Sequence, residues 1–236
     1  ITSAGEDLTL PLGTAYELRA TGSDPDGDVL YYCWEQLDSG QVDASNFGPN
    51  NHLGAQARSL PPSIMPTRTI PIMDAVLNRN LTQENPATGS RWETVSLVDR
   101  TLTWAVTARD RYPASAGQKG RTTSDIKLLK IVSDAGPFEI SSQNQAGIIW
   151  QAGSRQTILW NVAQTDRAPI NTKYVSILLS LDGGNTFEKT LLSSTPNDGQ
   201  EDITVPGGIS SDQVRIKVVP DNSIYFAVNS QNIQIT

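Results

Sequence analysis

Apolar and polar residues alternate along most of the chain in short runs, which is the pattern of half-buried β-strands. Turn residues separate the runs, as at Asp182-Gly183-Gly184-Asn185 and Pro196-Asn197-Asp198-Gly199. The predicted strands cover residues 8–11, 16–20, 29–37, 101–110, 125–132, 138–140, 156–162, 175–181, 186–192, 203–205, 214–218 and part of 225–236. This pattern predicts an all-β protein with antiparallel sandwiches.

The strand pattern is interrupted at Asp134-Ala135-Gly136-Pro137 and starts again after it. The length of 236 residues suits two domains of ordinary size. We therefore predict two tandem antiparallel immunoglobulin- or fibronectin-like β-sandwiches, one in residues 1–134 and one in residues 135–236.

The region from about residue 38 to residue 99 is less regular and is expected to be a long insertion in the first sandwich. Four of its prolines, at positions 61, 62, 66 and 71, exclude a regular helix around them. We expect one or two helical turns over residues 73–81. We also expect four apolar side chains to anchor the insertion: Leu60, Ile64, Ile70 and Ile72.

Charge and cysteine content narrow the function classes. The net charge of −7 argues against nucleic acid as a partner, because phosphate binding needs a basic surface. The sequence contains no run of about 18 apolar residues, so it does not predict a membrane-spanning helix. Cys33 is the only cysteine, so no internal disulfide can form, and we expect it to be a small buried apolar residue. The sequence starts at Ile1 without a signal peptide, and we expect it to be part of a longer protein.

An acidic turn, Asp24-Pro25-Asp26-Gly27-Asp28, precedes the strand that contains Trp34. In an immunoglobulin-like sandwich, this turn and the loop that begins near Asp110 lie at the same end. Asp24, Asp26, Asp28 and Asp110 are therefore candidate ligands for calcium, which prefers several carboxylate and carbonyl oxygens. An EF-hand does not fit, because Gly27 is at the fourth position of the loop and not the sixth. A polar turn without a metal remains the alternative, since Asp, Pro and Gly are ordinary turn residues.

A series of short motifs, in this order, resembles the region downstream of the catalytic domain in secreted bacterial zinc metallopeptidases of the reprolysin-like type. In the first half the resemblance rests on the acidic turn, Trp34-Glu35-Gln36-Leu37-Asp38, Arg58-Ser59-Leu60-Pro61-Pro62 and Arg109-Asp110. In the second half it rests on Ala135-Gly136-Pro137-Phe138, Thr157-Ile158-Leu159-Trp160-Asn161-Val162, Leu179-Ser180-Leu181-Asp182-Gly183-Gly184 and Thr195-Pro196-Asn197-Asp198-Gly199. The acidic turn also resembles cadherin-like and polycystic-kidney-disease-type modules. The chain departs from the family at Leu60, where an aromatic residue is usual.

This resemblance implies a secreted, non-catalytic accessory region, whose partners are the parent catalytic domain and a protein or polysaccharide substrate. The zinc site of such peptidases needs His-Glu-x-x-His, and His52 is the only histidine here. We therefore expect no zinc and no catalysis in these residues. Calcium would make the region more rigid.

The tryptophans leave a second function open. Trp34, Trp104 and Trp160 lie in alternating strands and are expected in the core. Trp92 and Trp150 lie in irregular segments, where exposed rings could stack on sugars; the alternative for Trp150 is that it packs into the end of the sandwich. The alternative function is therefore a carbohydrate- or cell-surface-binding module. An enzyme in its own right is a third and weaker interpretation, because no nucleophile-elbow motif or isolated pair of carboxylates supports it.

Overall fold

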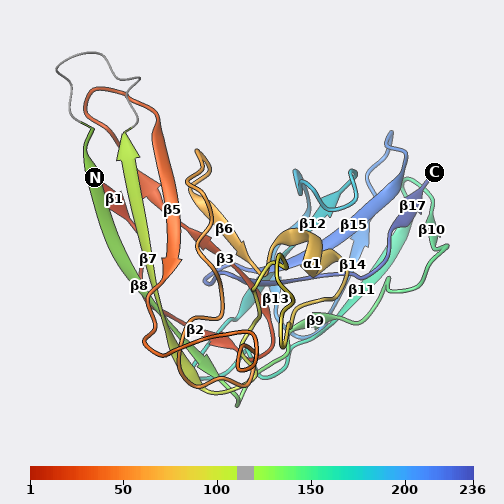
Figure 1. The fold of residues 1–236 in the computed structure, drawn as a ribbon. Helices are drawn as coiled ribbons and strands as arrows, with labels where there is room; N and C mark the ends of the chain where they lie inside the picture. The colour runs from red at the N-terminus through yellow and green to blue at the C-terminus, as the bar shows by residue number, and fades with distance from the viewer. Residues whose placement is uncertain (111–119) are drawn as a thin grey trace.

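A computed structural model gives the structure of residues 1–110 and 120–236. The strands form two arms that diverge from a common base, with the N-terminus on one arm and the C-terminus on the other (Figure 1). We call residues 1–134 the first arm and residues 135–236 the second arm. The predicted all-β class with two immunoglobulin-like sandwiches is confirmed. The division into two separate domains at residue 134 stays a prediction.

The first arm contains a four-stranded sheet in the order β2-β8-β7-β5, which packs against two further strands, β3 and β6. The bounds are β2 Leu8–Pro11, β3 Ala15–Arg19, β5 Leu30–Gln36, β6 Thr67–Ile70, β7 Arg100–Asp110 and β8 Thr122–Val132; the short strands β1 Thr2–Ser3 and β4 Thr21–Gly22 pair with each other. Side chains on alternate positions of β7 point into the core, and Trp104 on this face is fully buried. Its ring packs edge-on against Tyr16 of β3, with 6.5 Å between ring centroids.

The second arm has the same construction. Its larger sheet contains β10 Ile149–Trp150, β12 Tyr174–Ser180, β13 Lys189–Pro196, β15 Ser211–Pro220, β16 Tyr225–Val228 and β17 Ile233–Ile235; the facing sheet contains β9 Glu139–Ile140, β11 Arg155–Asn161 and β14 Gln200–Thr204. Ile158 of β11 lies in the same buried cluster as Ile177 of β12 and Ile216 of β15. Removing side chains of this size from water stabilises the fold by about 1.5–3 kcal/mol each.

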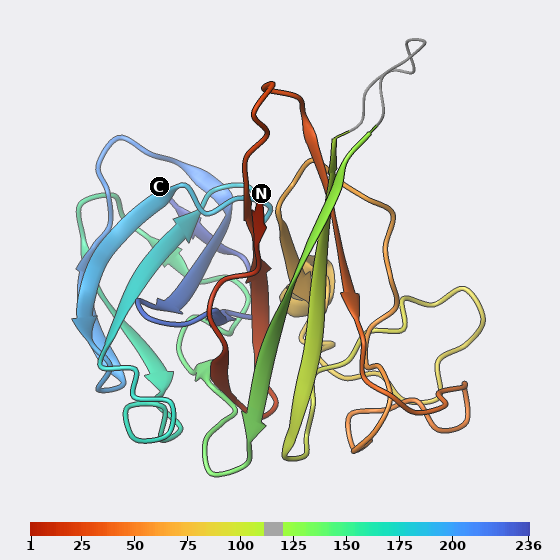
Figure 2. The ribbon, with the colours of Figure 1, turned by 90° about the vertical axis from the view of Figure 1, so that its left-hand side faces the viewer.

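One sheet runs through both arms. Strand β3 of the first arm pairs with β6 on one side and with β16 of the second arm on the other. Tyr16 lies opposite Tyr225, and the backbone N–H of Glu17 donates to the carbonyl of Ile224 at 2.9 Å. Figure 2 shows the whole ribbon from the side of the first arm. The arms are therefore joined by backbone hydrogen bonds and not only by the chain connection at residues 134–137.

The insertion holds β6 and one short helix, α1 Met73–Leu77, so the expected helical turn is present. The expected apolar anchors are mostly wrong. Ile70 is buried, but Leu60, Ile64 and Ile72 are 42%, 58% and 37% exposed. Polar contacts anchor the insertion in their place, as described below. No helix in residues 1–110 and 120–236 is long and apolar enough to cross a membrane.

Cys33 is only partly buried, because it lies on the side of edge strand β5 opposite the core, and its thiol donates to the carbonyl of Leu60 at 3.3 Å. The loop that begins near Asp110 lies largely outside the described residues.

Candidate functional site

The side chain of Asp24 stabilises the acidic turn. One carboxylate oxygen of Asp24 accepts from the backbone N–H groups of Asp26 at 2.9 Å and Asp28 at 3.2 Å. Gly27 follows with φ of +80°, a conformation that glycine adopts at little cost. Asp24 is thus part of the turn itself, as the metal-free interpretation requires, while Asp26 is exposed.

Asp110 does lie near this turn. Leu30 of β5 pairs with Asp110 of β7, and Asp24 and Asp110 line the same hollow of about 210 Å³. Partial loss of water contact raises the pKa of the Asp28 carboxyl, and the charges of Asp24, Asp110 and Asp26 raise it further. The charges of the other three predicted residues therefore reach Asp28.

These four carboxylates lie near one another but do not form a set of metal ligands. Among the described residues, no group of three or more His, Cys, Asp or Glu side chains is arranged so that it could hold a metal ion. One carboxylate oxygen of Asp110, the last residue of β7, accepts from the backbone N–H of Arg121. Calcium binding at these residues stays a prediction.

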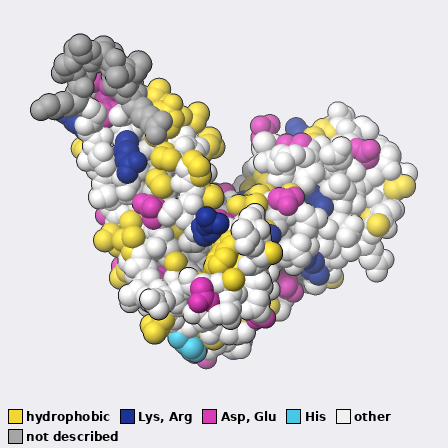
Figure 3. Space-filling view, in the orientation of Figure 1, with side chains coloured by type: hydrophobic (Ala, Val, Ile, Leu, Met, Phe, Trp, Pro, Cys, Tyr) yellow, Lys and Arg dark blue, Asp and Glu magenta, His cyan; other side chains and the backbone are white. Residues whose placement is uncertain are grey.

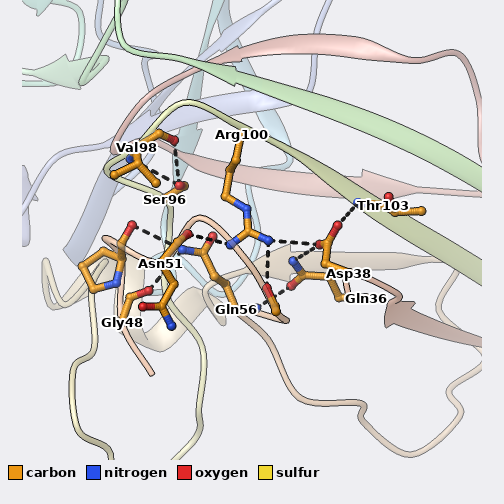
Figure 4. A network of polar contacts seen from close by, with 11 residues as sticks. Gln36, Asp38, Gly48, Asn51, Gln56, Ser96, Val98, Arg100 and Thr103 are labelled. Atoms are coloured by element: carbon orange, nitrogen blue, oxygen red, sulfur yellow. Dashed lines mark hydrogen bonds and ion pairs between the residues drawn. The ribbon is translucent and has the colours of Figure 1, made fainter. Parts of the chain in front are cut away.

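A polar network holds the beginning of the insertion against β7 (Figure 4). The buried guanidinium of Arg100 donates to the carbonyls of Asn51 and Gly54, each at 2.8 Å, and lies 3.5 Å from the Asp38 carboxylate. Asp38 in turn accepts from the backbone N–H of Thr103 at 3.0 Å. One arginine thus satisfies carbonyl groups of a segment that has no regular structure.

A second buried arginine holds the rest of the insertion. Arg68 of β6 forms an ion pair with Glu93 at 2.7 Å, and both side chains are at least 94% buried. Arg68 also donates to the Trp34 carbonyl at 2.7 Å, and its guanidinium carbon lies 5.4 Å from the centroid of the Trp104 ring. The other oxygen of Glu93 accepts from the backbone N–H of Ile72 at 2.8 Å. This pair connects β5, β6 and the end of the insertion.

Three of the five tryptophans lie where the sequence predicts them. Trp34, Trp104 and Trp160 are buried as expected. Trp150 is not exposed: it is 2% exposed and lies in β10, which pairs in parallel with β17, so it closes the core of the second arm. Trp92 is half-buried and remains a candidate for a binding surface.

Trp92 lies at the edge of a shallow hollow of about 390 Å³ on the insertion. The hollow is lined by Val42, Arg58, Thr88, Gly89 and Trp92. The buried ring of Phe47 packs edge-on against the indole, with 5.3 Å between centroids. No sequence pattern connects Arg58 with Trp92, because they come together through the bridge between Ala57 and Glu93.

Between the arms, α1 docks on the second arm. Val76 of α1 packs with Phe226 and Val228 of β16 in a small apolar cluster. Lys217 of β15 is buried beside this cluster, with its ammonium 4.0 Å from the centroid of the Phe226 ring and 4.0 Å from the Glu17 carboxylate. Burial lowers the pKa of Lys217, and the charge of Glu17 opposes that shift.

The notch between the arms is open to solvent, and hydrophobic side chains gather on its walls (Figure 3). A cavity of about 340 Å³ lies at the junction, lined by residues of both arms that include Val76, Leu81, Phe138 and Phe226. Arg79 and Glu139 supply the charged groups of this lining. Apolar cavities of this size at an interface between two units are common binding sites.

Helix α1 packs closely against Gly184 of the second arm. A Cβ at Gly184 would lie 2.4 Å from a methyl group of Leu77, whereas one at Gly183 would meet nothing nearer than 3.4 Å. Both glycines have positive φ, so alanine at either position costs about 1 kcal/mol. We expect Gly184→Ala to lower the free energy of unfolding by about 1–3 kcal/mol more than Gly183→Ala, because of overpacking. Chemical denaturation of both variants measures this; equal losses would contradict the packing.

Comparisons with known proteins do not assign the chain to a family. No family model and no curated protein matches the chain. The chain is similar to solved tandem modules: fibronectin(III)-like modules of Clostridium thermocellum CbhA, at 8% identity over 100% of this chain and 93% of that chain, with a TM-score of 0.27. A chimeric titin Z1Z2 tandem is similar at 12% identity over 98% of this chain and 95% of that chain, with a TM-score of 0.27. The two immunoglobulin domains of DIP-gamma are similar at 8% identity over 98% of this chain and 93% of that chain, with a TM-score of 0.23. These values are too low to assign a function.

Proposed function

We propose that this chain is a non-catalytic accessory region of a secreted bacterial metallopeptidase of the reprolysin-like type, which positions the catalytic domain relative to its substrate or to a surface. The observation that supports this most is the sheet shared by the two arms, through β3 and β16. A region that positions other domains must hold a fixed geometry, and backbone pairing across a junction provides that better than a flexible linker does.

The motif resemblance supplies the peptidase context of this proposal. Those motifs fall at places that shape the fold: Trp34 and Trp160 fill the two cores, and Gly136 lies at the junction. The resemblance is therefore one of scaffold, in keeping with a supporting role.

The test is a fusion of this chain to a reprolysin-like catalytic domain. We expect the fusion to cleave a protein substrate such as casein with a lower KM than the catalytic domain alone, while cleavage of a short peptide is unchanged. The isolated chain should hydrolyse neither casein nor an ester substrate. Turnover by the isolated chain, or equal effects of the fusion on protein and peptide, would contradict the proposal.

A second function is binding of carbohydrate, and the half-buried Trp92 in its hollow favours it. Retention of the isolated chain on insoluble or gel-embedded polysaccharides tests this function directly. No retention on acidic or neutral polymers would remove it and leave the positioning role.

Calcium stabilisation is a separate prediction. With a dissociation constant of about 10⁻⁴–10⁻³ M, calcium at about 5 mM stabilises the folded state by about 1–2 kcal/mol, or roughly 2–8 °C in melting temperature. Asp26→Asn should abolish the shift and keep the turn, because the turn hydrogen bonds use the carboxylate of Asp24. Asp212→Asn, which removes an exposed acid on the second arm, is the control. Equal melting temperatures in EDTA and in calcium would show that the turn binds no metal.

A further inference from the structure

The backbone at Trp92 is in an unfavourable conformation. Its φ is +52°, in the left-handed region that bulky residues rarely adopt. Such a conformation costs about 1–3 kcal/mol and persists only where the surroundings impose it. The next residue, Glu93, points into the core to pair with Arg68, while Trp92 lines the surface hollow. The left-handed turn thus places one side chain inside and its neighbour at the surface.

The position of the indole is fixed from several sides. The Trp92 carbonyl accepts from the backbone N–H of Arg58 at 3.1 Å, and Thr94 donates to the Gln56 carbonyl at 3.0 Å, so residues 56–58 and 92–94 run side by side. The buried Phe47 supports the ring. A ring held in this way binds a ligand without a further loss of rotamer freedom.

Arg58 brings a charged group to the same hollow. Its side chain is exposed and carries the only charge among the five residues that line the hollow. Within residues 1–110 and 120–236 its guanidinium makes no ion pair and no hydrogen bond. Only its backbone is engaged: the N–H donates to the Trp92 carbonyl, and the carbonyl accepts from the guanidinium of Arg68. Five N–H donors are therefore available, in a planar arrangement that matches a carboxylate.

We propose that the Trp92 hollow binds the sugar ring of an acidic polysaccharide, with the ring against the indole of Trp92 and its carboxylate on the guanidinium of Arg58. Thr88 lies in the same lining, and its hydroxyl is the group that would pair with a ring hydroxyl. This inference rests on the carbohydrate-binding function proposed above. Uronic-acid polymers, such as polygalacturonate, have the required combination of an apolar ring face and one carboxylate per sugar.

The test uses the complete chain and oligogalacturonides, with their methyl esters as matched ligands that keep the ring and lose the charge. Titration calorimetry in about 150 mM salt screens the general repulsion of the net charge of −7. We expect the acid to bind about tenfold more tightly than the ester, because charge-assisted hydrogen bonds to arginine are stronger than neutral ones.

Two variants separate the contributions. Trp92→Gly removes the ring while glycine accepts the positive φ, and it should weaken binding of acid and ester by about tenfold or more. Arg58→Gln keeps the backbone contacts of residue 58 and should make the acid and the ester bind equally. Unchanged melting temperatures show that both variants fold.

Three results would overturn the proposal: no binding of oligogalacturonides, binding unchanged by Trp92→Gly, or a preference for the acid that survives Arg58→Gln. If the chain is retained on a neutral polysaccharide while oligogalacturonides do not bind, the carbohydrate-binding function stands and this assignment of the site fails. If no polysaccharide is retained at all, both fail.

Discussion

Replacing Arg68 with methionine is expected to lower the free energy of unfolding by about 3–5 kcal/mol, because it leaves the Glu93 carboxylate buried without its cation. Arg68 and Glu93 are 6% and 1% exposed at their side chains, and their nearest atoms are 2.7 Å apart. The variant also removes the donor to the Trp34 carbonyl inside the first arm. Chemical denaturation, followed by tryptophan fluorescence, measures the loss.

Arg155→Met is the matched control for Arg68→Met. Arg155 lies 3.5 Å from Asp202, but the two side chains are 77% and 50% exposed, so this change should cost at most about 1 kcal/mol. The double variant Arg68→Met/Glu93→Gln should lose less than the sum of the two single variants, because no unpaired charge remains. Additive losses, or a loss for Arg68→Met as small as that of the control, would show that the pair does not hold the insertion.

Gly136→Ala is expected to lower the free energy of unfolding by about 2–5 kcal/mol, since it combines backbone strain with a clash. Gly136 has φ of +107°, and a Cβ there would lie 2.2 Å from the carbonyl oxygen and 2.8 Å from the backbone nitrogen of Leu12. These are backbone atoms that cannot rotate away. The backbone N–H of Leu12 also donates a hydrogen bond to the carbonyl of Ala135 at 2.8 Å. Relief of the clash must therefore separate the two arms at their base.

The control for Gly136→Ala is Gly153→Ala on the second arm. Gly153 has a similar positive φ, of +82°, but a Cβ there would meet nothing within 4 Å. Its substitution should therefore cost only about 1 kcal/mol. Thermal melting of both variants compares the two positions, and equal shifts would mean that the junction is not tightly packed at Gly136.

The alternating pattern predicted most of the strands because it reports directly on burial. In β7, Leu102, Trp104 and Val106 share the buried face, as the sequence indicates, and β12 follows the same rule with Val175 and Ile177. Periodicity of two is a local property, so a single strand contains all the information needed.

The junction could not be predicted in this way. Tyr16 and Tyr225 pair across more than two hundred residues, and no local pattern specifies which strand edges meet. The predicted apolar anchors of the insertion are also mostly wrong. Buried arginines that bind carbonyl and carboxylate groups hold the insertion, and not the apolar residues that hydropathy suggests. Polar anchoring leaves no periodic signal in a sequence.

The candidate sites show the same division. The proximity of Asp24 and Asp110 follows from the order of strands in a sandwich and was predictable. The sequence leaves open whether Trp150 is exposed or closes the end of the sandwich, because its burial depends on the two-residue strand β10 and its parallel pairing with β17. The meeting of Arg58 and Trp92 depends on one isolated bridge within the insertion.

The central claim, that the two arms form one rigid unit, is tested most directly by electron–electron distance measurements between spin labels on the two arms. Cys33→Ser provides a cysteine-free background, and Ser124→Cys with Asp212→Cys places labels at exposed sites on opposite arms. Thr190→Cys with Asp212→Cys, both on the second arm, gives the width expected of a rigid body. We predict a single distance between the arms with the same narrow width, which broadens in Gly136→Ala. A broad or multiple distribution in the otherwise unaltered chain would contradict the account.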